Sequence, residues 1–181
     1  MDIFQQARDK YTPATPKVLL ITEAPPAPER NRYFYYEHVR RGDSLFLELI
    51  KVLFPEEVNA FDTVKQIRAE KIYFLERLQE EGYALLHAHN APLPGRTAAS
   101  RTRVYREGLP HLIATLLRLG KPTTPIVLIS AVVFRAIAPG LRASGFNVIH
   151  DSLIEYPNSG QQLNFRRKLK PLLMRERLLP E

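Results

Sequence analysis

The chain contains no cysteine among its 181 residues. Disulfide bonds, thiolate-bound zinc, iron-sulfur clusters and cysteine nucleophiles are therefore excluded. The GxGxxG and GxxxxGK[ST] signatures of phosphate-binding loops are also missing, which counts against nucleotide hydrolysis, and so is the GxSxG elbow of serine hydrolases. No apolar run approaches the ~20 residues that cross a bilayer, so we expect no contact with a membrane.

Metal ligands are equally scarce in this sequence. Of the five histidines only His87 and His89 are close neighbours, and they lack the HExxH spacing of helical zinc sites. We therefore expect no metal and no other cofactor. Residues 1–6 lack the basic and apolar regions of a signal peptide, so we also expect a cytoplasmic protein, and we expect it to be a monomer.

Size and composition indicate one globular domain spanning residues 1–181. The chain has 45% hydrophobic and 25% charged residues, enough to bury a core without disulfide support. Its net charge of +7 favours polyanionic partners such as nucleic acid, although the excess could also serve solubility alone. The basic clusters in or beside predicted loops are Arg30/Arg32, Arg40/Arg41, Arg96/Arg101/Arg103/Arg106 and Arg166/Arg167/Lys168/Lys170.

Apolar stretches without polar alternation predict buried parallel strands. These stretches lie at residues 17–22, 83–88, 125–130 and 146–150. Helical spacing of apolar residues, with Gly, Pro and Asx boundaries, predicts helices at residues 2–10, 45–54, 63–81, 104–119, 131–138 and 163–178. Strands that alternate with helices favour an α/β fold with three layers, α/β/α, around a central four-stranded parallel sheet. The basic stretch 91–103 is predicted to be a loop.

Glu23 follows the first predicted strand directly, within the sequence Thr-Glu-Ala-Pro-Pro at residues 22–26. Open α/β sheets bind ligands in the crevice beyond the carboxyl ends of their strands, so Glu23 is a candidate functional residue. Polar residues after the other strands should reach the same edge. They are His87, Asn90, Ser130 and the segment from Tyr156 to Gln162. The alternative for Glu23 is a helix cap or a solvated loop position.

A run of four aromatic residues, Tyr33-Phe34-Tyr35-Tyr36, lies in the loop after the first strand. Aromatic rings beside arginines are what a protein needs to hold an unstacked base, because the rings stack on the base and the guanidinium groups bind phosphates. Any single ring of the run could instead pack the loop onto the sheet.

Four short motifs in this order resemble those of the uracil-DNA glycosylase superfamily, over residues 17–173. The first is the acidic, proline-containing turn at residues 22–26, and the second is an aromatic residue about a dozen positions later. The third, Gly82-Tyr83-Ala84-Leu85-Leu86-His87, has His where the family has Asn. The fourth, Tyr156-Pro157-Asn158-Ser159-Gly160, has Tyr where the family has its catalytic His. The absence of cysteine excludes the iron-sulfur branches of the family.

The resemblance implies a uracil-DNA glycosylase-like fold and a role for each matching position. Catalysis would fall to Glu23, Tyr156 and Asn158. The base would be bound by Pro25, Phe34, Tyr35, His87 and Asn90. DNA would be contacted by Arg101, Arg103, Ser159, Gln161, Arg166 and Arg167.

The function that follows is a DNA repair glycosylase, which flips a damaged or deaminated base such as uracil into a pocket and hydrolyses its N-glycosidic bond. The partner would be double- or single-stranded DNA. Two alternatives remain open. One is a nucleic-acid-binding protein of the same fold without catalysis, which the changes at His87 and Tyr156 would suit. The other is an enzyme that acts on a free nucleoside or nucleotide.

Overall fold

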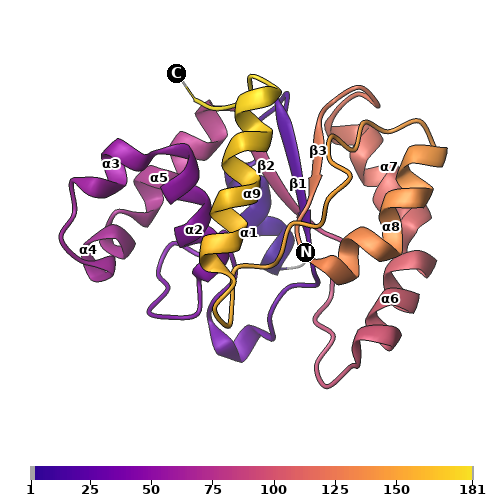
Figure 1. The fold of residues 1–181 in the computed structure, drawn as a ribbon. Helices are drawn as coiled ribbons and strands as arrows, with labels where there is room; N and C mark the ends of the chain where they lie inside the picture. The colour runs from indigo at the N-terminus through magenta and orange to yellow at the C-terminus, as the bar shows by residue number, and fades with distance from the viewer. Residues whose placement is uncertain (1–2, 181) are drawn as a thin grey trace.

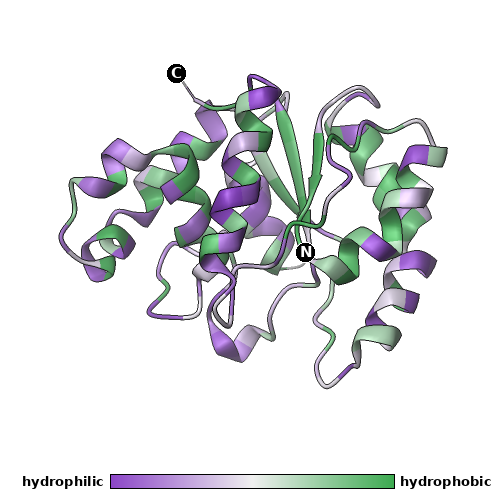
Figure 2. Cartoon of the chain, viewed as in Figure 1, coloured by the Kyte–Doolittle hydropathy of each residue, from purple (hydrophilic) through white to green (hydrophobic). Residues whose placement is uncertain are grey.

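A small parallel sheet lies at the centre of a mixed α/β fold (Figure 1). The structure is a computed structural model and describes residues 3–180. Its strands are β1 (Val18–Thr22), β2 (Tyr83–His87) and β3 (Ile126–Leu128), all parallel, in the order β2-β1-β3. Three of the four predicted strands are thus confirmed within one or two residues at their ends. Figure 2 shows why they could be recognised, since the strands are almost uniformly hydrophobic.

Side chains of the strands alternate between two hydrophobic clusters, one on each face of the sheet. On β1, Val18 and Leu20 belong to the first cluster, whereas Leu19 and Ile21 belong to the second. Neighbouring strands follow the same alternation. Burial on both faces explains why these strands are apolar up to their last residues, Thr22 of β1 and His87 of β2, and shows that the sheet is the middle layer of three.

Helices of the first layer all contribute to the cluster around Leu20. They are α1 (Ile3–Tyr11), α2 (Ser44–Leu53), α3 (Pro55–Asn59), α4 (Val64–Ala69), α5 (Lys71–Glu80) and α9 (Gln162–Arg175), and a short 3-10 turn, η1 (Pro28–Arg30), lies in the loop after β1. The opposite layer consists of α6 (Ala98–Glu107), α7 (Leu109–Leu119) and α8 (Ala131–Ala143). Within residues 3–180, no helix is long and apolar enough to cross a membrane.

The fourth strand predicted at residues 146–150 does not form. This part of the chain meets the free edge of β3 only through isolated parallel bridges, which join Ile126 to Val148 and Ile129 to Ile154. Between the bridges, the Leu128 amide donates to Nε2 of His150 at 2.9 Å. An imidazole therefore replaces the backbone acceptor that a continuous strand would supply, and the sheet has three strands where four were expected.

Several helix boundaries also differ from the prediction. The expected helix at 63–81 is divided at Glu70, whose φ of −96° and ψ of 21° leave helical geometry. The expected helix at 104–119 is divided at Gly108 and begins earlier, because Thr97 accepts a hydrogen bond from the Ser100 amide and caps α6 inside the predicted loop. Helix α8 continues through Pro139 to Ala143, so the predicted end at residue 138 is wrong.

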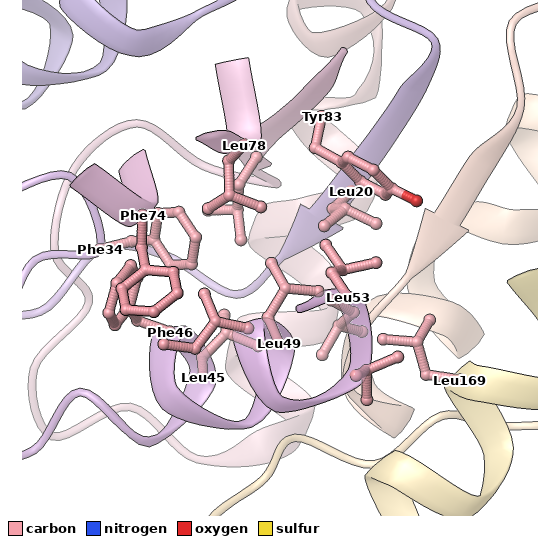
Figure 3. Packing of buried hydrophobic residues seen from close by; sticks show 14 of the residues in the cluster. Leu20, Phe34, Leu45, Phe46, Leu49, Leu53, Phe74, Leu78, Tyr83 and Leu169 are labelled. Atoms are coloured by element: carbon pink, nitrogen blue, oxygen red, sulfur yellow. The ribbon is translucent and has the colours of Figure 1, made fainter. Parts of the chain in front are cut away.

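The hydrophobic cluster around Leu20 contains several aromatic rings (Figure 3). Phe34, from the loop after β1, packs edge-to-face on Phe46 of α2 with ring centroids 5.7 Å apart. Both side chains are buried in the cluster with Leu20 and Leu49. This packing anchors the long loop between β1 and α2 to the sheet.

The loops that leave the carboxyl ends of the strands diverge. The chain passes from β1 to the layer of α2, whereas from β2 and β3 it passes to the layer of α6, α7 and α8 (Figure 1). Open α/β sheets form their binding crevice where neighbouring connections leave to opposite faces. The crevice of this fold therefore lies beyond the end of β1, where Glu23 follows the strand.

Candidate functional site

A cavity of about 350 Å³ opens at this edge of the sheet. Its wall includes five of the residues predicted for the site: Glu23, Phe34, His87, Tyr156 and Asn158. Residues from the loop before α2 and from α2 itself complete the wall, among them Asp43 and Phe46. The volume falls within the usual range for small-molecule sites, which begins at about 300 Å³.

The carboxylate of Glu23 is held by two side chains from other parts of the chain, Ser130 and Arg101. Its Oε1 accepts a hydrogen bond of 2.6 Å from the Ser130 hydroxyl, which lies between β3 and α8. Its Oε2 forms an ion pair with Arg101 of α6. The side chain remains 24% exposed and faces the cavity. The carboxylate is thus fixed in orientation while part of it stays open to a ligand.

His87 ends β2 beside Glu23, because the register of the sheet pairs His87 with Thr22. Its Nδ1 faces the backbone oxygen of Glu23, which places the ring proton on Nδ1. Burial lowers the pKa of His87 to about 4, so the imidazole is neutral near pH 7. Its Nε2 is buried and has no hydrogen-bond partner within residues 3–180, and as the unprotonated nitrogen it can only accept.

Tyr156 and Asn158 come from a tight turn that follows the bridge at Ile154. The Asn158 amide donates to the Tyr156 carbonyl at 2.8 Å, and the Gln161 amide donates to the Asn158 carbonyl at the same distance. Burial, together with the charge of Glu23, raises the pKa of Tyr156 to about 12. The phenol therefore keeps its proton at neutral pH and can donate it in a hydrogen bond.

Three residues predicted to bind the base do not line this cavity. Tyr35 is buried, and its hydroxyl accepts from the Leu85 amide at 2.7 Å, so it covers the edge of β2. The amide nitrogen of Asn90 lies 3.3 Å from Nε2 of His111, in a second cavity that His87 also lines. Pro25 is buried between two residues of the cavity wall and is not itself part of that wall.

The residues predicted to contact DNA divide into two groups. Arg101 and Arg166 form ion pairs inside the molecule, with Glu23 and with the buried carboxylate of Glu48 respectively. The other group lies on the surface, where Arg103, Ser159 and Arg167 are exposed and Gln161 is half-buried. The second group keeps polar atoms available to a partner.

A charged cluster that the sequence did not predict includes Asp43 of the cavity wall. Asp43 directly precedes α2 but makes no capping bond, and Arg68 donates to its two carboxylate oxygens at 2.6 to 3.2 Å. The fully buried Lys71 lies nearby, with its Nζ 4.6 Å from the ring centroid of Phe46. Lysine at a helix start carries no sequence signal of burial, so this cluster could not have been found from the sequence.

Comparison with protein-family models, curated proteins and solved structures finds no match to this chain. Its chemistry must therefore be inferred from the cavity itself. Residues 3–180 hold no group of three or more metal-binding side chains. The cavity offers the oriented carboxylate of Glu23, a buried aromatic ring, a neutral imidazole, and hydroxyl and amide donors. A second carboxylate of the wall, that of Asp43, is paired with Arg68.

Proposed function

We propose that this protein is a DNA glycosylase, which flips a damaged or deaminated base into the cavity at Glu23 and hydrolyses its N-glycosidic bond. The observation that supports the proposal most directly is that one cavity of about 350 Å³ brings together Glu23, Phe34 and Asn158. A flipped base needs an aromatic ring for stacking and polar groups for its edge. The reaction needs a carboxylate near the sugar.

The mechanism begins with cleavage of the bond between the base and C1′ of the sugar. The electron pair of that bond leaves with the base, and the sugar becomes an oxocarbenium-like cation. Glu23 stabilises this cation through its negative charge and orients a water molecule on the opposite face of the sugar. The water oxygen then bonds to C1′, and its proton passes to solvent.

The departing base carries negative charge and requires a hydrogen-bond donor. The Tyr156 hydroxyl and the side-chain amide of Asn158 can both donate a hydrogen bond. His87 cannot share this role, because its proton lies on Nδ1 and points to the Glu23 backbone. The proposal thus assigns stabilisation of the leaving base to the turn at residues 156–158.

The proposal extends to the fold. We infer that the chain is a divergent member of the uracil-DNA glycosylase-like fold, in which irregular bridges replace the fourth strand. Support comes from the order of its motifs and from the cavity, where the acidic turn, the aromatic residue and the last motif meet. His87 replaces the amide that the family uses to read a base, so several damaged bases, and not uracil alone, are candidate substrates.

The decisive experiment is a cleavage screen with the intact protein on oligonucleotides that contain uracil, hypoxanthine, xanthine or a mismatch. We expect cleavage of at least one substrate. We expect Glu23→Gln to lower its single-turnover rate by ~100-fold or more while leaving oligonucleotide binding intact, because the substitution removes the charge and keeps the shape. Glu76→Gln, an exposed change on α5, is the matched control and should leave the rate unchanged. Full activity of Glu23→Gln would refute the assignment.

A second candidate function is nucleic-acid binding without catalysis. It is favoured by the occupation of both Glu23 oxygens, one by Ser130 and the other by Arg101. On this view Glu23 would be structural. Binding of oligonucleotides without cleavage of any of them would support it over the glycosylase. Absence of DNA binding even at ~50 mM salt, where phosphate contacts count most, would instead favour an enzyme on free nucleosides or nucleotides.

A further inference from the structure

Ser130, between β3 and α8, has a backbone conformation that serine rarely adopts. Its φ is 104° and its ψ is 134°, in a region populated almost entirely by glycine. The residue is buried, with 3% of its surface exposed. Within residues 3–180, the other non-glycine residues with positive φ have values of 42° to 54° and are exposed: Asn31, Ser159 and Arg177. Ser130 is therefore the buried and strained member of this group.

The polar atoms of Ser130 contact both Glu23 and the segment that leads to Tyr156. Its hydroxyl donates to Oε1 of Glu23 at 2.6 Å and accepts from the Val132 amide at 3.2 Å, which caps α8. Its own amide donates to the carbonyl of Ile154 at 2.8 Å, two residues before Tyr156. One residue thus contacts both the carboxylate after β1 and the segment that leads into the turn at residues 156–158.

Glycine would fit this backbone better than serine does. Glycine adopts positive φ without a steric penalty, and it replaces serine at a helix cap at little cost. What glycine cannot supply is the hydroxyl that Glu23 accepts from. Without it, Arg101 of α6 would be the only side chain still bonded to the carboxylate among those described, and Glu23 could swing toward it.

We propose that Ser130 is a positioning residue, whose strained backbone is retained because it aims the hydroxyl at Glu23 and fixes the carboxylate in the cavity. This inference rests on the proposed function, in which Glu23 must face the sugar of a flipped nucleotide. Ser130 itself touches neither sugar nor base. Its contribution is the orientation of Glu23 relative to the donors at Tyr156 and Asn158.

Three substitutions at Ser130 separate positioning from stability. In Ser130→Gly the hydroxyl is lost and the backbone strain is relieved, so we expect a melting temperature at or above that of the wild type. We nevertheless expect its single-turnover cleavage rate to fall by about 10- to 100-fold, with the oligonucleotide Kd within about twofold of the wild type. Ser130→Ala should lose the same rate and also melt at a lower temperature, since alanine stays strained at this φ.

Ser130→Thr provides the converse case. It keeps the hydroxyl, but a β-branched residue is poorly suited to positive φ, so it should melt below the wild type. We expect the folded fraction of this variant to cleave within a few-fold of the wild-type rate. A structural role alone would make activity follow melting temperature across the variants. The proposal is overturned if Ser130→Gly cleaves at the wild-type rate, or if activity follows stability in all three.

A readout that does not depend on activity is the ¹³C resonance of the Glu23 side-chain carboxyl, assigned by its loss in Glu23→Gln. We expect the resonance to move in Ser130→Gly and in Ser130→Ala. It should stay in place in Arg177→Gly, an exposed control that also relieves positive φ. An unmoved resonance in Ser130→Gly would show that Ser130 does not hold Glu23. If the wild type cleaves no substrate, the proposed function fails, whereas this resonance still decides the contact.

Discussion

At the scale of single residues, Lys71 is a normally charged side chain that lies in the hydrophobic interior. It is fully buried at the start of α5, and its Nζ has no hydrogen-bond partner within residues 3–180. The ring of Phe46 at 4.6 Å and the charge of Asp43 compensate in part. Burial outweighs them and lowers the pKa of Lys71 from 10.5 to about 8.

The lowered pKa implies that the charged form of Lys71 opposes folding. Between pH 8 and 10.5 the unfolded chain binds the proton and the folded chain releases it, so this group makes stability rise with pH across that window. We expect Lys71→Met to increase the free energy of unfolding at pH 7, by up to about 3 kcal/mol, and the gain to vanish toward pH 10.5. Urea unfolding at several pH values measures both effects. Lys65→Met, exposed on α4, is the control, and a Lys71→Met protein less stable than the wild type would contradict the expectation.

The sequence located residues of the cavity wall where their position after a strand was decisive. Glu23 follows β1 directly and His87 ends the neighbouring β2, so the register of the two strands brings them together, and both line the cavity. It predicted them poorly where side-chain direction was decisive. Tyr35 and Phe34 are adjacent and both buried, yet Tyr35 faces the edge of β2 while Phe34 lines the cavity. No spacing rule for a loop could have distinguished these two rings.

At the scale of secondary-structure elements, His150 determines how the sheet ends. Its Nε2 accepts from the Leu128 amide, and its Nδ1 lies 2.8 Å from the carbonyl of Ser152, so the proton resides on Nδ1. Burial lowers the pKa of His150. Protonation of Nε2 would leave no acceptor for the Leu128 amide, so the edge of β3 depends on a neutral imidazole.

This dependence predicts a loss of stability in acid. Because the pKa of His150 is lower in the folded chain than in the unfolded chain, its contribution is complete above about pH 6.5 and declines as the pH falls below that value. We expect His150→Gln, which can still accept through its side-chain oxygen, to flatten part of the decline between pH 7 and 5. His150→Ala leaves the Leu128 amide without a partner and should cost about 1–3 kcal/mol at pH 7.

Thermal unfolding across this pH range checks the prediction. His38→Gln, an exposed change, is the control and should keep the wild-type pH profile. His87 also has a lowered pKa and will contribute to the remaining decline. A wild-type profile for His150→Gln would show that His150 does not set the acid sensitivity of the sheet edge.

The elements that the sequence predicted are those whose pattern is local. Three strands are continuous apolar runs, and α1 and α9 are amphipathic and lie within about three residues of their predicted bounds. The fourth predicted strand does not form, because the His150 side chain accepts from the Leu128 amide and interrupts the ladder of backbone hydrogen bonds. A pattern of apolar residues does not predict such a bond. Helix α8 is longer than predicted, and Gly140 suits its packing, since a Cβ there would clash with the Leu109 side chain.

At the scale of the whole molecule, the charge balance differs from what the composition suggests. Part of the basic excess is used internally, because Arg101, Arg166 and Arg68 each pair with a carboxylate that is buried or half-buried. The positive charge available to a polyanion therefore lies on exposed residues such as Arg103 and Arg167. Arg103 forms an ion pair with Glu107 at 3.9 Å, but both side chains are about 70% exposed. An exposed pair at this distance is weak, so Arg103 can still bind a phosphate.

Because some arginines are paired within the molecule and others are exposed, we expect substitutions of the two kinds to affect DNA binding differently. Each exposed arginine that contacts a phosphate releases a counterion, so Arg167→Gln should reduce the slope of log K against log salt by about 0.9 on duplex DNA. Arg166→Gln, one residue away, should mainly lower the melting temperature, because it removes an ion-pair partner of the buried Glu48. Gel-shift titrations between 50 and 200 mM salt measure the slope, because the affinity of a protein with ~6 phosphate contacts falls strongly across this range of salt.

The control is Lys65→Gln on α4. It removes the same charge away from the sheet edge and should leave the slope unchanged (Figure 1). Equal slopes for Arg167→Gln and Lys65→Gln would mean that Arg167 does not contact the phosphate backbone.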